Sequence, residues 1–270
     1  MPELPEVETT VRGLRPVLVG ARIASLEARR PDLRRALPLD LRQRMTGAVV
    51  TSVRRRAKYG LIDTDRGDTM IFHLGMSGHW RIDPAALGAH DHLVIDTDDG
   101  RRVALNDARR FGSIDAVRTE AVDEWPQIAA LGPEPLGPDF NAAALAARLA
   151  GRKAPIKAML MDGRIVAGLG NIYVCEALNT ARISPARVAG RISVGRLARL
   201  VDAIRQVLLA AIEAGGSTLR DFRAPDGSVG YFPLQYRVYG REGETCPCGG
   251  TVKRRVESGR STFYCPTCQR

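Results

Sequence analysis

Four cysteines crowd the last 25 residues of the chain, in the order Cys246-Pro-Cys248, sixteen residues, then Cys265-Pro-Thr-Cys268. Zinc prefers four soft ligands in a tetrahedron, and two cysteine pairs on facing turns supply them. The second pair has the usual two-residue spacing, whereas a single residue separates the first pair. Two glycines follow the first pair and give its backbone freedom to turn both sulfurs inward. We expect one structural zinc ion and no catalytic metal; a reduced metal-free tail and a redox pair are the alternatives.

The start of the chain, Met1-Pro2-Glu3, holds a second candidate for chemistry. Proline at position 2 permits removal of Met1, which would expose a secondary amine just before a helix, where the helix dipole disfavours positive charge. A neutral secondary amine can attack a sugar aldehyde carbon and form an iminium. Glu3 beside it can serve as an acid or a base. Taken alone, most such starts have no function.

A helix and a set of short strands must position these groups. Leu4, Val7, Val11 and Leu14 recur at helical spacing and predict a helix over 4–19. From about 22 to 118 the pattern is β-like, with turn sequences such as DRGD and TDDG. Many short strands separated by turns indicate an antiparallel sandwich or barrel. The expected strands are 22–29, 48–56, 59–64, 69–74, 79–83, 91–97, 101–106 and 112–118.

The pattern becomes helical after a Pro- and Gly-rich linker, LGPEPLGPDF, at 131–140. We expect helices over 140–150, 155–162, 171–180 and 193–214, and a loop over 217–232. The last helix should end at Gly215-Gly216. The final 30 residues are too few to fold without a bound metal ion or another cross-link. The apolar face of the last helix is expected to comprise Val194, Leu197, Leu200, Val201, Ile204, Val207, Leu208 and Ile212.

The composition indicates a partner with negative charge. The 270 residues hold 40 Lys and Arg against 30 Asp and Glu, a formal charge of +10. Nucleic acid is the commonest partner of so basic a chain, although an Arg-heavy, Ala-rich composition also explains the excess. No apolar run approaches the ~20 residues of a membrane span. The acidic start does not read as a signal peptide, so we expect a cytoplasmic chain.

Several motifs together resemble those of bacterial formamidopyrimidine-DNA glycosylases, in the family's order from residue 2 to residue 269. The related endonuclease VIII branch shares the Pro-Glu start and the zinc finger but lacks PELPEVET, HLGMSG and RRFG. The motifs are PELPEVET (2–9), RRAKYG (55–60), HLGMSG (73–78), HDH (90–92), ARRFG (108–112), LGPEPL (131–136), GLGNIY (168–173), GYF (230–232), VYGR (238–241) and GRSTFYC (259–265).

The resemblance implies an α+β multidomain fold. Residues 1–130 would form a catalytic domain, an N-terminal helix with an antiparallel β-sandwich. Residues 131–234 would form a helix–two-turns–helix DNA-binding domain with a lesion-capping loop at 217–230, whose base-reading residue we do not identify. Residues 235–270 would form a zinc-finger β-hairpin.

The resemblance also implies the catalytic roles. Pro2 would attack C1′ of a damaged nucleoside, and Glu3 would protonate the sugar and help to open its ring. The base would leave, and β- then δ-elimination from the resulting Schiff base would cut the strand. Lys58 would contact the phosphate near the lesion and donate a proton. Arg260 would clamp a phosphate and assist δ-elimination.

The DNA contacts follow from the same resemblance. Base excision requires extrusion of the nucleotide, because C1′ is blocked inside a stacked duplex. Met76, Arg109 and Phe111 would fill the gap, with the arginine pairing to the orphaned cytosine. From the residues alone Met76 and Phe111 are more often core residues, and Arg110 is an alternative to Arg109. Phosphate and other DNA contacts are expected from Asn171, His90, Arg152 and Lys157.

The implied function is a bifunctional DNA glycosylase and abasic-site lyase. Its partner would be double-stranded DNA with an oxidised purine, such as 8-oxoguanine or a formamidopyrimidine. One alternative is a glycosylase for oxidised pyrimidines, which the motifs around Met76 and 108–112 disfavour. Another is a non-catalytic zinc protein that binds DNA, which the presence of Pro2, Glu3 and Lys58 disfavours. We expect a bacterial monomer associated with the nucleoid and no membrane partner.

Overall fold

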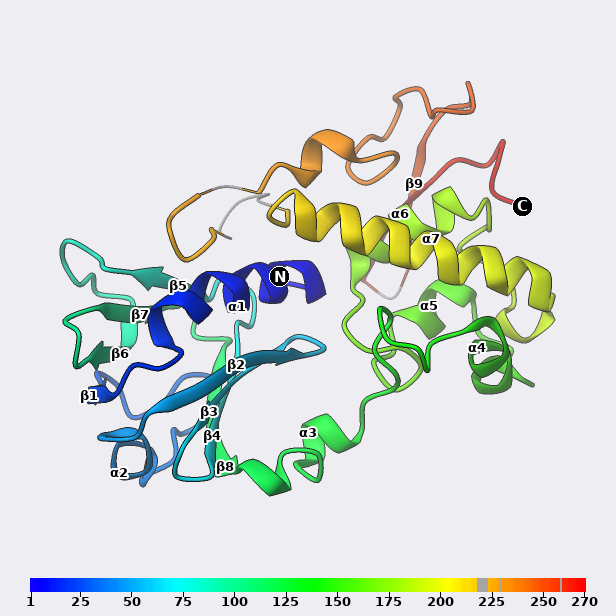
Figure 1. Ribbon diagram of the computed structural model, residues 1–270. Helices are drawn as coiled ribbons and strands as arrows, with labels where there is room; N and C mark the ends of the chain where they lie inside the picture. The colour runs from blue at the N-terminus through cyan, green and yellow to red at the C-terminus, as the bar shows by residue number, and fades with distance from the viewer. Residues whose placement is uncertain (218–222, 229, 258) are drawn as a thin grey trace. The chain divides into compact units, whose positions relative to one another are not determined.

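The computed structural model describes residues 1–217, 223–228, 230–257 and 259–270 (Figure 1). The chain forms two compact units. The first comprises Met1–Ala129 and Ile212–Tyr231, and the second comprises Ala130–Ala211 and Phe232–Arg270. The predicted boundaries of three domains stay a prediction. No helix among the described residues has both the length and the apolar character that a membrane crossing requires.

The first unit is built on two four-stranded antiparallel sheets. One has the strand order β2-β3-β4-β8 and the other the order β1-β6-β7-β5. The strands are β1 (Ile23–Ala28), β2 (Val50–Arg56), β3 (Tyr59–Thr64), β4 (Asp68–His73), β5 (His79–Ile82), β6 (Asp91–Thr97), β7 (Arg102–Asn106) and β8 (Ser113–Arg118). Each agrees with an expected strand to within two residues, since turn residues separate several of the strands.

Helix α1 (Leu4–Leu18) packs against strands of both sheets, namely β2, β3 and β5. Its apolar residues Val7, Val11 and Leu14 are fully buried in the core of the unit. In the same core the rings of Phe72 and Trp80, one from each sheet, meet edge to face with their centroids 5.5 Å apart. The predicted helix and the predicted antiparallel sandwich are both confirmed.

Several short helices of the first unit were not predicted from the sequence. They are α2 (Leu41–Met45), the 3₁₀ turn η1 (Thr119–Ala121) and α3 (Pro126–Ala129). A helix of one turn contains too few residues to show a 3.6-residue period, so hydrophobic patterning cannot reveal it.

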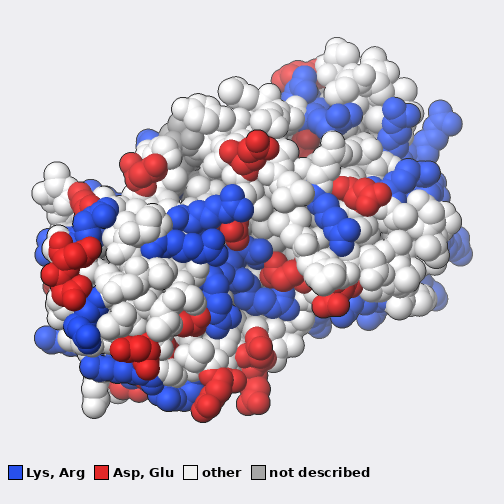
Figure 2. All heavy atoms as spheres, in the orientation of Figure 1, with Lys and Arg blue, Asp and Glu red and all other residues white. Residues whose placement is uncertain are grey.

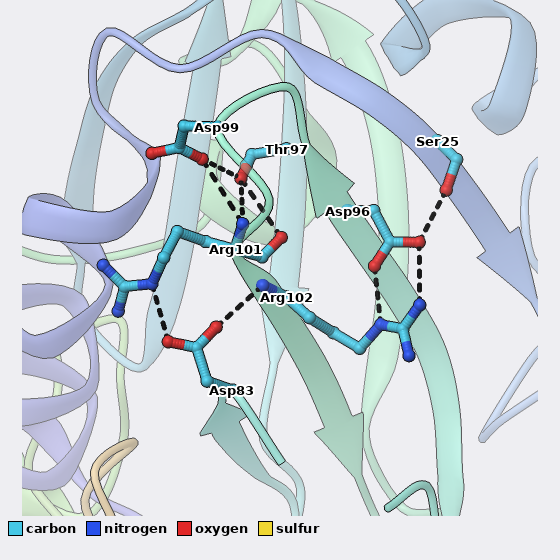
Figure 3. A network of polar contacts seen from close by, with 7 residues as sticks. All are labelled: Ser25, Asp83, Asp96, Thr97, Asp99, Arg101 and Arg102. Atoms are coloured by element: carbon cyan, nitrogen blue, oxygen red, sulfur yellow. Dashed lines mark hydrogen bonds and ion pairs between the residues drawn. The ribbon is translucent and has the colours of Figure 1, made fainter. Parts of the chain in front are cut away.

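The arginines around the β6–β7 turn hold carboxylates of their own unit (Figure 3). Nε of Arg102 donates to Asp96 at 2.6 Å, and Nε of Arg101 donates to Asp83 at 2.6 Å. These pairs are exposed and contribute little to stability. They do show that part of the arginine excess is paired locally and is not free to bind an external anion.

The second unit is mainly helical. Its elements are α4 (Ala142–Leu149), α5 (Ile156–Leu160), α6 (Asn171–Thr180), η2 (Ala189–Arg191), most of α7 (Val194–Glu213), η3 (Phe232–Gln235) and the hairpin of β9 (Lys253–Glu257) and β10 (Arg260–Tyr264). Asn141 caps α4, accepting a hydrogen bond from the backbone N–H of Ala144 at 3.0 Å. Helix α7 ends before Gly215-Gly216 as predicted. Val194 was expected on its buried face but is largely exposed, because it occupies the first position of the helix.

Candidate functional site

A network of backbone and carboxylate groups holds the start of the chain. Pro2 is buried and Glu3 is 3% exposed, and Glu3 is the N-cap of α1. The backbone N–H of Glu3 donates to Oε2 of Glu6 at 2.8 Å in a capping box. The other oxygen of Glu6 accepts a hydrogen bond from the backbone N–H of Ser217 at 2.7 Å. The carboxylate of Glu6 therefore ties the residue after Pro2 to the first residue of the predicted capping loop.

The chemistry of Pro2 depends on Met1. In the chain as it stands Met1 is joined to Pro2 and half exposed. The nitrogen of Pro2 is then an amide and is not nucleophilic. Excision of Met1 is required to convert it to the secondary amine that the predicted reaction needs.

Lys58 lies in the tight turn between β2 and β3, and its side chain is half-buried. The preceding Ala57 adopts a left-handed conformation with φ of 54°. The positive charge of Lys58 interacts electrostatically with His73 at the end of β4. Burial first, and then the positive charge of Lys58, lower the pKa of His73 to about 4. Lys58 therefore lies near a histidine that stays neutral at physiological pH.

His73 was not among the residues singled out in the sequence. Its Nδ1 accepts a hydrogen bond from the backbone N–H of Gly75 at 3.0 Å, so the neutral ring carries its proton on Nε2. Its ring also lies 5.0 Å from that of Tyr59, centroid to centroid. The available signal was its place as the first residue of HLGMSG, directly before the loop that carries Met76.

The three predicted wedge residues lie on two loops of the first unit. Met76 is 38% exposed and Phe111 is 44% exposed, which excludes the alternative that both are core residues. Gly75 has φ of 60°, and a Cβ there would come within 2.3 Å of the backbone of Phe111. The loops carrying Met76 and Phe111 therefore touch through their backbones, and only glycine fits at their closest approach.

Asp107, which the sequence motifs did not single out, joins these loops. It is fully buried, and its Oδ1 accepts a hydrogen bond from the hydroxyl of Ser77 at 2.7 Å. Its Oδ2 accepts one from the backbone N–H of Gly112 at 2.8 Å. Both loops therefore take their conformation from a single buried carboxylate. The signal in the sequence was the acidic residue directly before the ARRFG motif.

Arg109 and Arg110 differ in conformation. The guanidinium carbon of Arg109 lies 4.9 Å from the ring centroid of Phe111, a cation–π contact, and its backbone N–H donates to Ser77. Arg110 has φ of 56°, the left-handed region, and its backbone N–H donates to the carbonyl of Asp107. The contact between Arg109 and Phe111 places these two side chains together, and their role at DNA stays a prediction.

His90 is exposed and adjoins the same loops. Its carbonyl accepts a hydrogen bond from the backbone N–H of Asp107 at 2.9 Å, and its ring lies 6.2 Å from that of His92. His92 is itself buried beside the carbonyl of Asp107. The structure therefore brings His90 near the loop that carries Arg109 and Phe111, and its contact with DNA stays a prediction.

Positive charge is concentrated on part of the first unit. Figure 2 shows Lys and Arg side chains gathered over α1 and the β2–β3 hairpin. Of the arginines of β2, Arg54 pairs with Asp63 and Arg55 with Glu8. Burial is the largest single effect on the pKa of Glu8 and raises it. The hydrogen bonds and positive charges of Arg12 and Arg55 together exceed that effect, so the pKa is lowered. Although these pairs neutralise part of the charge, Lys and Arg side chains predominate on this part of the surface and make it attractive to a polyanion (Figure 2).

In the second unit, helix α6 and the β9–β10 hairpin hold two predicted DNA contacts. Nδ2 of Asn171, the first residue of α6, donates to the carbonyl of Ser261 at 2.8 Å. Arg260, the residue before Ser261, is exposed at the start of β10. A side chain from the N-terminus of α6 thus fixes the backbone that carries Arg260.

Lys157 occupies a different environment from the exposed one that a phosphate contact would suggest. It is 4% exposed, and its Nζ donates to the hydroxyl of Thr262 at 2.6 Å. Burial lowers its pKa. Lys157 and Arg260 both line a cavity of about 390 Å³ in the second unit. The other lining residues are Pro155, Ala158, Met161 and Glu257.

Arg152 lies in the exposed turn after α4. Its carbonyl accepts a hydrogen bond from the backbone N–H of Gly190 at 3.0 Å, which fixes the turn and leaves the side chain outside. Arg152 lines a second cavity together with Arg148, Arg164 and Asp162. Arg164 donates to the carboxylate of Asp162 at 2.8 Å, so part of the positive charge of this cavity is already paired.

The four cysteines converge as the sequence predicted. Their sulfurs all lie within 4.8 Å of one another. The Sγ atoms of Cys246 and Cys268 are 4.0 Å apart, and those of Cys248 and Cys265 are 3.5 Å apart. Zn–S bonds of about 2.3 Å at tetrahedral angles require about 3.8 Å between sulfurs. The cluster fits a zinc ion.

The short first pair closes through a glycine turn. Gly249 has φ of 84°, and its backbone N–H donates to the carbonyl of Cys246 at 2.8 Å. The backbone N–H of Cys246 donates in turn to the carbonyl of Gly250 at 2.7 Å. The single residue between Cys246 and Cys248 is therefore sufficient to direct both sulfurs inward.

A helix-capped antiparallel sandwich, a helical unit and a four-cysteine hairpin together define a zinc-finger protein of the helix–two-turns–helix class. Sequence models of three domains match the chain in order. They are the formamidopyrimidine-DNA glycosylase N-terminal domain at 1–114, the H2TH domain of the same family at 131–223, and the zinc finger found in FPG and IleRS at 243–270. The chain belongs to the formamidopyrimidine-DNA glycosylase family.

Relatives and solved structures agree over the full length. The chain is 68% identical to the formamidopyrimidine-DNA glycosylase of Rhizorhabdus wittichii and 63% identical to that of Novosphingobium aromaticivorans, covering 100% of each chain. It is similar to the MutM (Fpg) protein of Thermus thermophilus, with a TM-score of 0.89 at 41% identity, covering 99% of this chain and 98% of that one. It is also similar to Lactococcus lactis Fpg bound to DNA containing an abasic site, with a TM-score of 0.91 at 34% identity and 99% of both chains covered.

Proposed function

We propose that this protein is a base-excision repair enzyme that removes oxidised purines from double-stranded DNA and then cuts the abasic strand. The observation that carries the proposal is the start of the chain. There Pro2 precedes a buried Glu3, which the hydrogen bond from its N–H to Glu6 fixes at the N-terminus of α1. Family membership across the full chain supports the same activity.

The reaction uses the free amine of Pro2 after Met1 has been removed. The amine attacks C1′ of the damaged nucleoside, the N-glycosidic bond breaks, and the base leaves with a proton. Glu3 protonates the ring oxygen of the sugar, which opens the ring and gives an iminium between Pro2 and C1′. Loss of the C2′ proton drives β-elimination of the 3′ phosphate. A further proton loss drives δ-elimination of the 5′ phosphate.

Basic residues hold the phosphates during these steps. Lys58 contacts a phosphate at the lesion, and neutral His73 beside it adds an N–H donor without adding charge. Arg260 contacts phosphate from the second unit, and Asn171 fixes the hairpin under it. Arg152 and His90 add exposed contacts, while Lys157 positions the hairpin through Thr262. Met76, Arg109 and Phe111 fill the space that the extruded nucleotide leaves.

Borohydride trapping on a duplex with 8-oxoguanine opposite cytosine tests the mechanism. Protein whose Met1 has been removed should form a covalent adduct that denaturing electrophoresis detects, and Pro2→Gly should abolish it. Absence of any adduct with correctly processed protein would refute the proposal. A panel of duplexes with oxidised pyrimidines decides the alternative, since excision faster than from 8-oxoguanine would assign the chain to the pyrimidine branch.

Metal supplies no step in this scheme. A zinc ion held by the four cysteines cross-links the hairpin that presents Arg260 and contributes folding energy. The relatives are bacterial proteins, so the enzyme works in the cytoplasm, where the chromosome lies. We further propose that it associates with the nucleoid and acts as a monomer. Analytical ultracentrifugation of the protein, alone and bound to a lesion duplex, would measure its mass and test whether it is a monomer.

A further inference from the structure

The four-cysteine cluster has a polar neighbour on a helix of the second unit. Nδ2 of Asn179, near the C-terminal end of α6, lies 3.8 Å from Sγ of Cys246 and 3.9 Å from Sγ of Cys268. Asn179 is 2% exposed, so bulk water does not reach its amide. The amide nitrogen is therefore within reach of weak N–H···S hydrogen bonds to two of the four sulfurs.

The partners of Asn179 fix which end of its amide faces the sulfurs. Oδ1 accepts a hydrogen bond from Nε of Arg237 at 3.1 Å, and Nδ2 donates to Oε1 of Gln269 at 3.0 Å. An arginine can only donate, so the oxygen must be the atom that faces Arg237. The remaining hydrogen of Nδ2 is then directed to the cysteines.

Gln269 connects the amide of Asn179 to the second cysteine pair. Its Oε1 also accepts a hydrogen bond from the backbone N–H of Cys265 at 2.7 Å, and its Nε2 donates to the carbonyl of Ile183 at 2.9 Å. The two side-chain amides form a connected and satisfied network between α6, the turn after it and the second cysteine pair. Such networks are rigid when all their members are paired.

One face of α6 is turned to the cysteine hairpin. Asn171, Cys175 and Asn179 recur every four residues and share that face. Asn171 donates to the backbone of Ser261. Cys175 packs in one buried cluster with Cys246 and Cys265. Asn179 is the polar residue of this face that reaches the sulfurs themselves.

We propose that Asn179 is a positioning residue for the zinc centre, donating a hydrogen bond to the thiolates of Cys246 and Cys268. Four thiolates carry more negative charge than one Zn²⁺ neutralises, and N–H donors stabilise the excess. Partners of this kind orient the ligands and tune the metal. Because Asn171 on the same helix fixes the backbone beside Arg260, helix α6 connects the zinc centre to a proposed phosphate contact. The inference rests on the structural zinc and not on the proposed reaction.

Two substitutions in the full-length zinc-loaded protein test this role. Asn179→Asp keeps the oxygen that faces Arg237, where it gains an ion pair, but places an acceptor against the sulfurs and against Oε1 of Gln269. Asn179→Leu has a similar volume and removes both functions. Asn141→Ala is the matched control, since it removes the cap of α4 in the same unit but does not touch the hairpin. Zinc affinity is measured by competition with a chromophoric chelator.

We expect the zinc dissociation constant to rise about 10–100-fold in both Asn179 variants and to stay at the wild-type value in Asn141→Ala. In cobalt-substituted protein, the sulfur-to-cobalt charge-transfer band should shift in both variants. If Asn179→Leu fails to fold, Asn179→Asp decides alone. Wild-type zinc affinity and an unshifted cobalt band in Asn179→Asp would overturn the proposal. This holds even if Asn179→Leu binds zinc more weakly, because a loss of affinity in the leucine variant alone indicates a packing role for Asn179.

Discussion

The hydroxyl of Ser77 donates a 2.7 Å hydrogen bond to the buried carboxylate of Asp107, and this bond joins two loops that are 30 residues apart in the chain. One loop carries Met76, and the other carries Arg109 and Phe111. The second oxygen of Asp107 holds the backbone of Gly112. The proposed wedge residues are exposed, so they contribute little packing of their own, and their positions depend on the carboxylate beneath them.

Replacement of Asp107 should therefore damage both loops. Asp107→Ala leaves the buried N–H of Gly112 without its acceptor, which costs about 1–3 kcal/mol. We expect a lower melting temperature and slower single-turnover excision of 8-oxoguanine. Asp98→Asn, at an exposed turn of the same unit, is the control and should leave both unchanged. Wild-type excision by Asp107→Ala would show that the loops do not depend on this carboxylate.

We expect Arg109, and not Arg110, to determine the preference for cytosine opposite the lesion. Arg109→Ala removes the side chain proposed to pair with the orphaned cytosine, an interaction worth about 1–3 kcal/mol of discrimination. We expect excision opposite cytosine to fall toward the rates opposite other bases. Arg110→Gly relieves the left-handed backbone and should keep the wild-type preference with equal or greater stability. Excision kinetics on duplexes with each opposite base measure the difference, and a loss of preference only in Arg110→Gly would reverse the assignment.

His73 should make stability depend on pH in acid. Its pKa is about 4 in the folded chain, chiefly because of burial and secondly because of Lys58, against an ordinary value of 6.5. Between these values the unfolded chain binds more protons, so stability falls as the pH drops from about 6.5 to about 4. The shift corresponds to a loss on the order of 3 kcal/mol.

His73→Asn should flatten this dependence, because the amide oxygen can accept from Gly75 and does not titrate. Urea unfolding at several pH values measures the slope between about pH 4 and about pH 6.5. His79→Asn is the matched histidine control in the same unit. A slope unchanged in His73→Asn would mean that other groups dominate acid unfolding.

Zinc content should depend on the four converging cysteines and not on the fifth cysteine of the chain, Cys175. Cys248→Ser removes an exposed ligand, so we expect well under one zinc per chain and weaker binding to a lesion duplex, since the hairpin loses its cross-link. Cys175→Ala deletes a buried sulfur that is not one of the four converging sulfurs and should retain one zinc. Elemental analysis and binding titrations give both quantities. Full zinc content in Cys248→Ser would exclude this cysteine as a ligand.

Much of this protein could be predicted from short stretches of sequence. The strands β3 and β6 and the helix α6 have the predicted bounds, because the turn residues and glycines beside them are local features of the sequence. The cysteine spacing was sufficient to predict the zinc cluster, and the motifs were sufficient to identify the family. The one-turn helices α2 and α3 were missed, since local patterning needs more residues than they contain.

The tertiary structure decided what each side chain faces. The family resemblance implied a DNA contact for Lys157, and only the tertiary structure shows that its Nζ is buried against Thr262, 105 residues further along the chain. His73 and Asp107 were not selected, because their roles arise from Lys58 and from Ser77, which only the sheets bring near. Asn179 gave no signal either, as its neighbours Cys246 and Cys268 lie at least 67 residues away. Residue types and their spacing determine which chemistry is available, whereas burial and the distances between remote residues determine which groups perform it.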